Sequence, residues 1–462
     1  MVVPKGLVRI KRRELTSMAR EMIKRELTIV PCATSSFDTN LDPIRLWVDL
    51  LVDQEQYLFV PRGYYYSVIK KRFDLQCHFP FSIGRSCLAF TSPISLREGQ
   101  EEMISGAIQL MTQNSFGGAI IEAPTGSGKT IFSLEVARRL NRKTLVVVHT
   151  NVLKDQWVEN IKKFTKWSVG IIQNGVIDTE NKDVCVVMIH TLSMSEYIPE
   201  WISDEFGLVI YDEVHISGAR EFQKALFRLR PRYILGLSGT LNRKDKADNV
   251  FKYGIGSVVQ SKVDLKVLTP TVYFIDTKYI YDDIGIALDK ERVQFLASVI
   301  YDEHRNALII KNAMNAVQAG RHVLILSDRV DHVGLLYAAL SKKLPGIKVG
   351  MIVGSTKKKE RAYVLDSQVL CATTQLLGIG FDNPRLDTLI FATPSQSPFQ
   401  AVGRILRQHP DKKSPVVIDL VDTSDMARIF GLSRRRKYLE KNWVIKGDEC
   451  LKKQLRRDYG SF

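Results

Sequence analysis

The segment Ala123–Thr130 constrains the fold most strongly, because it reads Ala-Pro-Thr-Gly-Ser-Gly-Lys-Thr between an expected strand and an expected helix. Residues 119–121 are apolar and predict the strand, and residues 131–140 predict the helix. This order is the setting of a phosphate-binding loop, where backbone N–H groups and a helix N-terminus meet phosphate oxygens. The segment departs from the usual pattern at Ala123, which stands where the first glycine would be.

The residues of this loop have separate expected roles. We expect Lys129 to reach the β- and γ-phosphates of a nucleotide and the Thr130 hydroxyl to hold Mg²⁺. The alternative is a glycine-rich turn that binds nothing. The expected nucleotide-binding residues of the loop are Pro124, Thr125, Gly126, Ser127, Gly128, Lys129 and Thr130.

Apolar, β-branched runs alternate with helix-like segments along most of the chain, which predicts parallel α/β sheets. The expected strands after the loop are residues 144–148, 184–189, 208–211, 233–237, 272–275, 322–326, 369–372, 388–391 and 415–419. The pattern restarts after a connector near residues 260–270, so two α/β domains are expected. The predicted division is an accessory region at 1–90, domains at 91–265 and 266–430, and a basic extension at 431–462.

The charge of the chain favours a polyanionic partner. Its 462 residues carry 66 Lys and Arg against 50 Asp and Glu, a net charge of +16. Neutralising phosphates releases condensed counterions, so nucleic acid is the expected partner, and a merely basic protein is the alternative. Six cysteines without a C-x-x-C pair argue against a zinc ribbon and fit a reducing cytoplasm. We see no bilayer-length apolar run and no secretory signal, so a cytoplasmic protein with no membrane partner is expected.

Two adjacent carboxylates follow the apolar run at 208–211, in the sequence Asp212-Glu213-Val214-His215. At the end of a strand near a phosphate loop, such a pair can serve a Mg²⁺-nucleotide site. Asp212 would hold the metal, and Glu213 would act as general base on the attacking water. Without the phosphate loop, the pair would be read as a solvated turn.

Together these motifs resemble a known series. The phosphate loop, then 212–215, then Ser-Gly-Thr at 238–240 and Gln-Ala-Val-Gly-Arg-Ile-Leu-Arg at 400–407 resemble the motifs of superfamily 2 helicases. The resemblance covers about residues 95–430 and points to the DExH branch with the phage UvsW-type and XPB-like DNA helicases. It implies two tandem RecA-like domains with a small α+β N-terminal accessory domain.

The resemblance also assigns further residues, each by its place in the motifs. The resemblance assigns recognition of the adenine base to Arg97 and Gln100, and it assigns further nucleotide contacts to Gly380 and Asp382. Contacts with the nucleic-acid backbone fall to Thr150, Lys154, Gln156, Trp157, His190, Thr191, Arg329, Thr373 and Thr374. Coupling of hydrolysis to movement falls to His215, Ser238, Thr240 and Gln400.

Arg404 and Arg407 resemble the arginine fingers of this series. A guanidinium suits the charge that develops on γ-phosphate oxygens. The two residues are three apart, so a helical turn would point both the same way. Because they fall in the second expected domain and Lys129 in the first, ATP is expected to bind between the domains.

The implied activity is ATP-dependent unwinding or translocation on forked, branched or partly single-stranded DNA, with ATP and Mg²⁺ as cofactors. Replication, recombination with branch migration, and repair are the expected settings, with proteins of those processes as further partners. The compact chain resembles a bacteriophage or viral member acting in the host cytoplasm. An RNA helicase, a viral transcription-associated duplex DNA translocase and a scaffold without turnover are the alternatives, because the core motifs contact a backbone that RNA and DNA share.

The flanking regions are basic. Residues 1–90 carry 14 Lys and Arg against 9 Asp and Glu, and residues 428–462 carry 11 against 4. We expect the first region to recognise DNA structure, and the alternative is that it covers an apolar face of the motor. The tyrosines at 64–66 are expected either to stack on bases or to form core. The run Arg434–Lys437 is expected either to contact phosphates or to form a solvated helix face.

Overall fold

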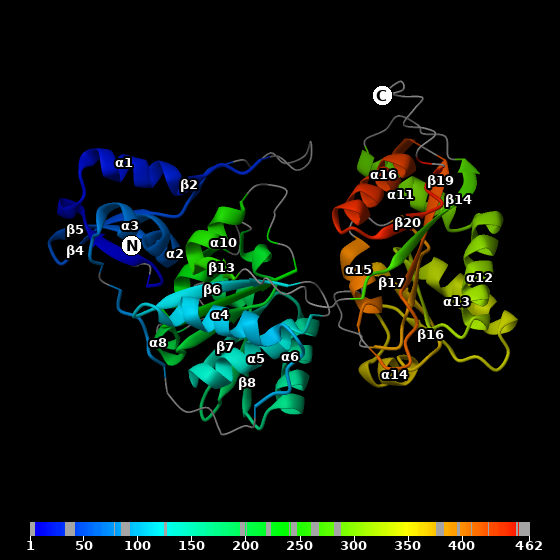
Figure 1. Ribbon diagram of the computed structural model, residues 1–462, viewed down its shortest axis with the longest axis horizontal. Helices are drawn as coiled ribbons and strands as arrows, with labels where there is room; N and C mark the ends of the chain where they lie inside the picture. Colours follow the sequence, from blue (N-terminus) through cyan, green and yellow to red (C-terminus); the bar gives the residue numbers. More distant parts are fainter. Residues whose placement is uncertain are drawn as a thin grey trace. The chain divides into compact units, whose positions relative to one another are not determined.

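A computed structural model shows two compact units, one comprising residues 1–124 and 128–266 and the other mainly residues 267–462. In Figure 1 the first unit runs from blue to green and the second from green to red. The structure describes residues 5–32, 42–77, 79–84, 93–123, 127–194, 199, 201–218, 223–239, 241, 247–259, 268–280, 288–375, 383–394, 398–407, 409–423, 425–449 and 451.

The first unit is built on an eight-stranded sheet. Its strands are Gly117–Glu122 (β6), Thr144–Val148 (β7), Val169–Gln173 (β8), Val176–Ile177 (β9), Val184–Met188 (β10), Leu208–Tyr211 (β11), Tyr233–Ser238 (β12) and Ser257–Val259 (β13). They lie in the order β13-β6-β12-β11-β7-β10-β8-β9, and only the β8–β9 pairing is antiparallel. The strands β7, β10, β11 and β12 are buried along their whole length, which explains their continuous apolar runs.

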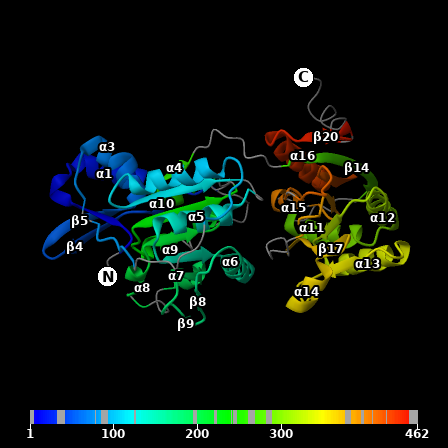
Figure 2. The same cartoon turned by 60° about the horizontal axis from the view of Figure 1, so that its bottom comes forward.

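Helices cover both faces of this sheet, as the two views show (Figures 1 and 2). One apolar core contains residues of Gln100–Thr112 (α4), Lys129–Leu140 (α5) and Asn151–Phe164 (α6). The other contains residues of Ile189–Ser193 (α7), Ile202–Glu205 (α8), Gln223–Arg228 (α9) and Asp248–Ile255 (α10). Successive β7 residues alternate between the two cores, as strand geometry requires.

The accessory region is a small α+β unit, as expected. Its sheet contains Val8–Lys11 (β1), Glu55–Val60 (β5) and Val48–Val52 (β4) in the antiparallel order β1-β5-β4. Its further elements are Ser17–Glu26 (α1), the short pair Thr28–Ile29 (β2) and Ile44–Arg45 (β3), Arg62–Tyr64 (α2), a π-helical turn at Tyr65–Ile69 (η2), and Lys70–Phe73 (α3).

This region shares an apolar core with the first sheet. The buried Arg62 donates hydrogen bonds to the carbonyls of Pro231 (2.8 Å) and Arg232 (3.3 Å), at the start of β12. The ring of Tyr64 packs edge-on against that of Tyr253, with 5.0 Å between centroids. Tyr64 and Tyr65 are buried, so these two tyrosines form core and are not exposed for stacking on bases.

The second unit contains a seven-stranded parallel sheet in the order β16-β17-β15-β18-β19-β14-β20. Its strands are Thr271–Ile280 (β14), Val323–Ser327 (β15), Val349–Ile352 (β16), Val369–Thr373 (β17), Thr388–Phe391 (β18), Val416–Thr423 (β19) and Val444–Lys446 (β20). Its helices are Leu288–Val299 (α11), Glu303–Gln318 (α12), Val330–Lys343 (α13), Lys358–Val364 (α14), Pro398–Ile405 (α15) and Asp425–Glu440 (α16).

The segment expected as a basic extension is integrated into this second unit. Strand β20 pairs with β14, and the basic run lies on α16. Arg434 is buried, and its guanidinium donates to both carboxylate oxygens of Asp419 at 2.8–3.0 Å. Arg434 is therefore neither a phosphate contact nor part of a solvated face, because its charge is neutralised inside the core. Within the described residues, no helix is long and apolar enough to span a bilayer.

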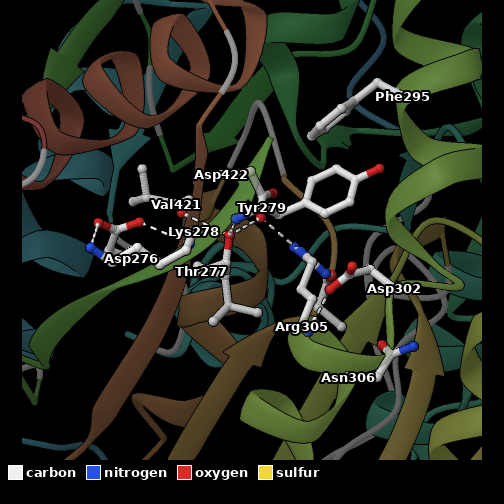
Figure 3. A network of polar contacts seen from close by, with 12 residues as sticks. Asp276, Thr277, Lys278, Tyr279, Phe295, Asp302, Arg305, Asn306, Val421 and Asp422 are labelled. Carbon is white, nitrogen blue, oxygen red and sulfur yellow. Dashed lines mark hydrogen bonds and ion pairs between the residues drawn. The ribbon is translucent and has the colours of Figure 1, made fainter. Parts of the chain in front are cut away.

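A second buried ion pair links α12 to the carboxyl ends of three strands (Figure 3). Arg305 Nε donates to Asp422 Oδ1 at 2.8 Å, and Asp422 is the last buried residue of β19. Asp422 Oδ1 also accepts a 2.6 Å bond from the Thr277 hydroxyl of β14, and Arg305 donates to the carbonyl of Ala392 beyond β18. Buried charges are costly unless they are paired, so this network holds the three strand ends together.

Candidate nucleotide site and nucleic-acid face

The phosphate loop joins β6 to α5, as the sequence predicts. Gly128 is the N-cap of α5 with φ +92°, a conformation that favours glycine. A Cβ on Gly128 would also lie 2.6 Å from Gln100 Nε2, so the position has no room for a side chain. Ser127 is buried, and Lys129 and Thr130 begin the helix, where N–H groups face outward from its N-terminus. Pro124, Thr125 and Gly126 lie outside the described residues.

The expected catalytic side chains of the first unit lie together. Lys129 Nζ is 3.0 Å from Glu213 Oε1, although β7, β10 and β11 all separate the two residues in the chain. Asp212 Oδ2 accepts a 2.9 Å bond from the indole Nε1 of Trp157, and Asp212 Oδ1 accepts one from the Glu213 backbone N–H. Glu213 has φ +51°, a strained conformation for a residue with a side chain.

The two carboxylates differ in the direction of their pKa shifts because their environments differ. Burial, together with the charge of Glu213, raises the pKa of Asp212 above its usual value. Burial also opposes ionisation of Glu213, but the Lys129 ammonium outweighs it and lowers the pKa of Glu213. Glu213 is therefore the better-stabilised anion of the pair. Such a division between neighbouring acids is typical of sites with a distinct base.

The residues expected to couple hydrolysis to movement include His215, which lies next to Glu213. His215 Nδ1 lies 2.9 Å from the hydroxyl of Ser238, at the end of β12, and 3.5 Å from Glu213 Oε2. Because β11 and β12 are neighbours, the two motifs meet through the sheet. Thr240 and the side chain of Gln400 lie outside the described residues.

The expected adenine-reading residues precede α4. Gln100 is buried, and its Oε1 accepts a 2.8 Å bond from the Arg97 backbone N–H. Its amide nitrogen faces Gly128 of the phosphate loop. The structure thus brings Gln100 to the loop, and Gly380 and Asp382 lie outside the described residues.

The expected nucleic-acid contacts of the first unit lie beyond β7 and β10. Thr150 caps α6 by accepting from the Leu153 N–H at 3.3 Å, and Lys154 Nζ donates to Gln173 at 2.7 Å. Gln156 is half-buried on α6. His190 and Thr191 lie in α7, with His190 exposed and Thr191 half-buried.

Trp157 differs from its expected position. It is 2% exposed and packs in the core beneath α6. A side chain without accessible surface does not reach a nucleic-acid backbone, so its place in this structure is to hold Asp212. The sequence did not show this role, because the Trp157–Asp212 bond connects a helix to a strand that only the fold brings together.

In the second unit, the loop between β15 and α13 holds Arg329 at the N-cap of the helix. Ser327 Oγ accepts from the Arg329 N–H (3.2 Å) and donates to His332 Nδ1 (3.0 Å), while His332 Nε2 donates to Asn306 Oδ1 (2.8 Å). The Asn306 amide nitrogen donates to Ile300, which leaves its oxygen as the acceptor and places the histidine proton on Nε2. Burial lowers the pKa of His332 to about 3, so the ring is neutral at physiological pH.

The remaining motif residues lie on β17 and α15. Thr373 is buried at the end of β17, and Thr374 follows half-buried. Burial lowers the pKa of Arg404 to about 10 and also lowers that of Arg407, and both stay cationic at neutral pH. Arg404 lies in α15, but this helix ends at Ile405, so Arg407 lies beyond the turn that was expected to align them.

The residues present suit a Mg²⁺-nucleotide. The Thr130 hydroxyl and the Asp212 carboxylate offer the oxygen ligands that Mg²⁺ prefers, and this ion usually completes its shell with phosphates and water. Among the residues with described positions, no group of three His, Cys, Asp or Glu side chains is placed to hold a metal alone.

Comparisons with known proteins agree with these motifs. Residues 93–243 match the family described as "Type III restriction enzyme, res subunit". The chain is 27% identical over 432 residues to a "Putative ATP-dependent RNA helicase" of Acanthamoeba polyphaga mimivirus, covering 91% of this chain and 81% of that protein. It is 29% identical over 316 residues to a "Probable helicase" of Escherichia phage T5, covering 65% of this chain and 67% of that protein. By these likenesses the chain is similar to helicases, and its motifs resemble those of superfamily 2.

The fold of the chain agrees with solved structures. S. cerevisiae Dbp5 bound to RNA and ADP BeF3 matches with a TM-score of 0.50 at 17% identity, over 78% of this chain and 97% of that one. A putative HsdR subunit of a type I restriction enzyme from Vibrio vulnificus matches with a TM-score of 0.51 at 21% identity, over 71% of this chain and 65% of that one. These likenesses concern the fold alone, and they confirm the expected tandem RecA-like domains.

One further residue of the motif that contains Thr150 is His149. His149 follows β7, whose neighbours in the sheet are β11 and β10. Its Nδ1 is buried without a hydrogen-bond partner, and burial lowers its pKa, although the charge of Glu213 opposes that shift.

Proposed function

We propose that this protein hydrolyses ATP to unwind or move along DNA, with forked, branched or partly single-stranded duplexes as substrates. The observation that carries the proposal is the Lys129–Glu213–Asp212 cluster at the phosphate loop. It joins a phosphate-binding cation, an ionised base and a metal-binding carboxylate in one place. The net charge of +16 supports a polyanionic substrate.

The proposed chemistry transfers the γ-phosphoryl group to water. The water oxygen bonds to phosphorus, the bond from phosphorus to the bridging oxygen breaks, and Glu213 accepts the water proton. Lys129 would exchange its bond with Glu213 for phosphate oxygens, which frees the carboxylate to act as base. Mg²⁺, held by Thr130 and Asp212, would neutralise phosphate charge.

Arg404 and Arg407 complete the proposal by stabilising the charge that develops in the transition state. Arg407→Ala is therefore expected to lower kcat far more than it raises the KM for ATP. Unchanged kcat with a raised KM would restrict Arg407 to ground-state binding. Arg404 is expected to affect both constants, because its buried guanidinium also suits the bound phosphate.

An RNA helicase is the second candidate. The mimivirus relative carries that name, and so does a relative from African swine fever virus that is 23% identical over 425 residues. The backbone-contact residues do not discriminate, because RNA and DNA share the sugar-phosphate chain. The viral origin of these relatives supports a place in viral replication or recombination. We also propose that the protein belongs to the DExH branch, that it acts in branch migration and that it comes from a bacteriophage.

One panel separates these candidates. ATPase stimulation and strand separation would be measured with single-stranded DNA, forked DNA, Holliday junctions and RNA duplexes. Glu213→Gln provides the matched control without turnover. DNA-selective stimulation and fork unwinding support the proposal, RNA-selective activity would assign the second candidate, and translocation without strand separation would indicate a transcription-type translocase.

A further inference from the structure

A cavity of about 450 Å³ opens within the first unit, between the accessory region and the motor sheet. Its lining comes from η2 and α3 on one side and from α4 and the starts of β6 and β13 on the other. Sites of this volume hold small ligands or parts of larger ones. The lining residues that matter here are Tyr66, Ser67, Lys70, Lys71, Asp74 and Asn114.

The cavity is separate from the candidate nucleotide site. Gly117 and Gly118 line it at the start of β6, whereas the phosphate loop follows the other end of this strand. Six residues of strand span about 20 Å at ~3.3 Å per residue. A ligand here would therefore contact the accessory region and the amino edge of the sheet, and not Lys129.

The charge of the cavity lining is net positive, with Lys70 and Lys71 against Asp74. Lys70 Nζ donates to Asn114 Oδ1 at 3.1 Å and lies 5.5 Å from the centre of the Tyr66 ring. Asp74 also lines the cavity, but within the described part of the chain no carboxylate lies within 4.0 Å of the Lys70 or Lys71 ammonium. Two adjacent lysines in a hollow, beside neutral hydrogen-bonding groups, suit an anion.

Two irregular backbone segments contribute to the wall of the cavity. The π-helical turn Tyr65–Ile69 interrupts the helical segment and carries Tyr66 and Ser67 into the lining. Asp74 ends α3 with φ +50°. Single π-turns inside helices are uncommon and frequently occur at functional sites.

We propose that this cavity binds a phosphate group of a nucleic-acid strand, with Lys70 and Lys71 as the cationic contacts and Ser67 and Asn114 as neutral ones. The proposal rests on the proposed function, which supplies the strand, and it deepens that function by giving the accessory region a defined contact. A free nucleotide or inorganic phosphate offers the same chemistry, so the experiment distinguishes these sources.

The test measures how oligonucleotide affinity depends on salt, in the full-length protein and in Lys70→Ala/Lys71→Ala. Each phosphate contact contributes about 0.7 to 0.9 to the slope of log K against log salt, so the slope should fall by up to about 1.4–1.8. Lys162→Ala/Lys163→Ala is the matched control, because it removes two adjacent exposed lysines from α6 of the same unit. Its slope should match that of the wild-type protein.

Ser67→Asp gives a second variant that keeps both lysines and adds a carboxylate to an exposed position in the lining. It should weaken oligonucleotide binding without lowering the melting temperature. An unchanged salt slope in the lysine variant without any loss of phosphate-dependent stabilisation, or an equal loss in the control pair, would overturn the site. Phosphate-dependent stabilisation that the lysine variant loses, together with an unchanged oligonucleotide slope, would reassign the source to a free phosphate compound.

The outcomes also separate this site from the proposed function. A wild-type protein whose ATPase no nucleic acid stimulates would contradict the proposed function itself. Normal stimulation together with an unaltered slope and no loss of phosphate-dependent stabilisation in Lys70→Ala/Lys71→Ala would contradict only the cavity.

Discussion

Lys129 Nζ and Glu213 Oε1 lie 3.0 Å apart, although 84 residues separate them in the chain. The pair forms because the phosphate loop follows β6 and the carboxylates follow β11, and both strands run in the same direction in one sheet. In this arrangement the Lys129 ammonium favours the ionised form of the Glu213 carboxylate and lowers its pKa. The candidate nucleotide site therefore contains a preformed ion pair between the phosphate loop and the end of β11.

Lys129→Ala is expected to lower ATP hydrolysis by at least about 100-fold, because a positioned charge at the phosphates is lost. The fold should persist, since Lys129 lies at the start of α5 and is not a member of either apolar core. Steady-state ATPase and a thermal melt test both statements. Normal turnover by the folded variant would remove Lys129 from the site.

Glu213→Gln is expected to bind ATP but hydrolyse it very slowly, because the amide keeps the shape and cannot accept the proton. Binding of a fluorescent ATP analogue and single-turnover hydrolysis check the two halves separately. A variant that fails to bind nucleotide would instead indicate a structural or metal-holding role for Glu213.

The melting temperature of Asp212→Asn, measured relative to that of the wild-type protein, is expected to increase as the pH rises. The raised pKa of Asp212 means that the folded state holds its proton above pH 3.8, where the unfolded chain releases it. Wild-type stability therefore falls through this range, and the neutral amide escapes that loss. Thermal melts at pH 4 and pH 7 measure the difference, which should be larger at pH 7, while hydrolysis is lost. A constant difference would contradict the assigned direction.

Trp157→Phe is expected to lower kcat while leaving nucleic-acid affinity and its salt dependence unchanged. The ring keeps most of the packing, but the 2.9 Å bond to Asp212 is lost. Gln156→Ala, on the same helix and half-buried, is the neighbouring control for nucleic-acid affinity. Weaker oligonucleotide binding with normal ATPase in Trp157→Phe would restore the original assignment to the nucleic-acid face.

Removal of residues 1–92 is expected to produce an aggregating or early-melting protein. The accessory region shares a core with the first sheet, and buried Arg62 bonds to carbonyls at the start of β12. Exposing such an apolar face leaves no folded motor in which to measure a separate loss of fork preference. Arg62→Ala should show the same weakness more mildly, by about 1–3 kcal/mol in the free energy of unfolding. A soluble, stable truncated protein with ATPase activity would contradict the shared core.

The strands and the phosphate loop could be predicted from sequence because they depend on local pattern. A continuous apolar, β-branched run is buried on both sides most readily as a central strand of a parallel sheet. Residues 144–148 and 208–211 accordingly form strands β7 and β11 with the expected bounds. The loop also needs only neighbours in sequence, a strand before Ala123 and a helix after Gly128. The resemblance supplied the order of the remaining motifs.

Tertiary structure decided which residues of similar character became surface, core or site. Trp157 and Arg434 look like surface groups in the sequence, yet each is buried against a carboxylate, Asp212 or Asp419, from another element. Local pattern reports amphipathicity within one element, whereas burial depends on what packs over it from elsewhere. The same reason explains why the tyrosines at 64 and 65 became core and why the basic tail supplied an edge strand. The burial of these residues depends on long-range packing, which sequence periodicity does not encode.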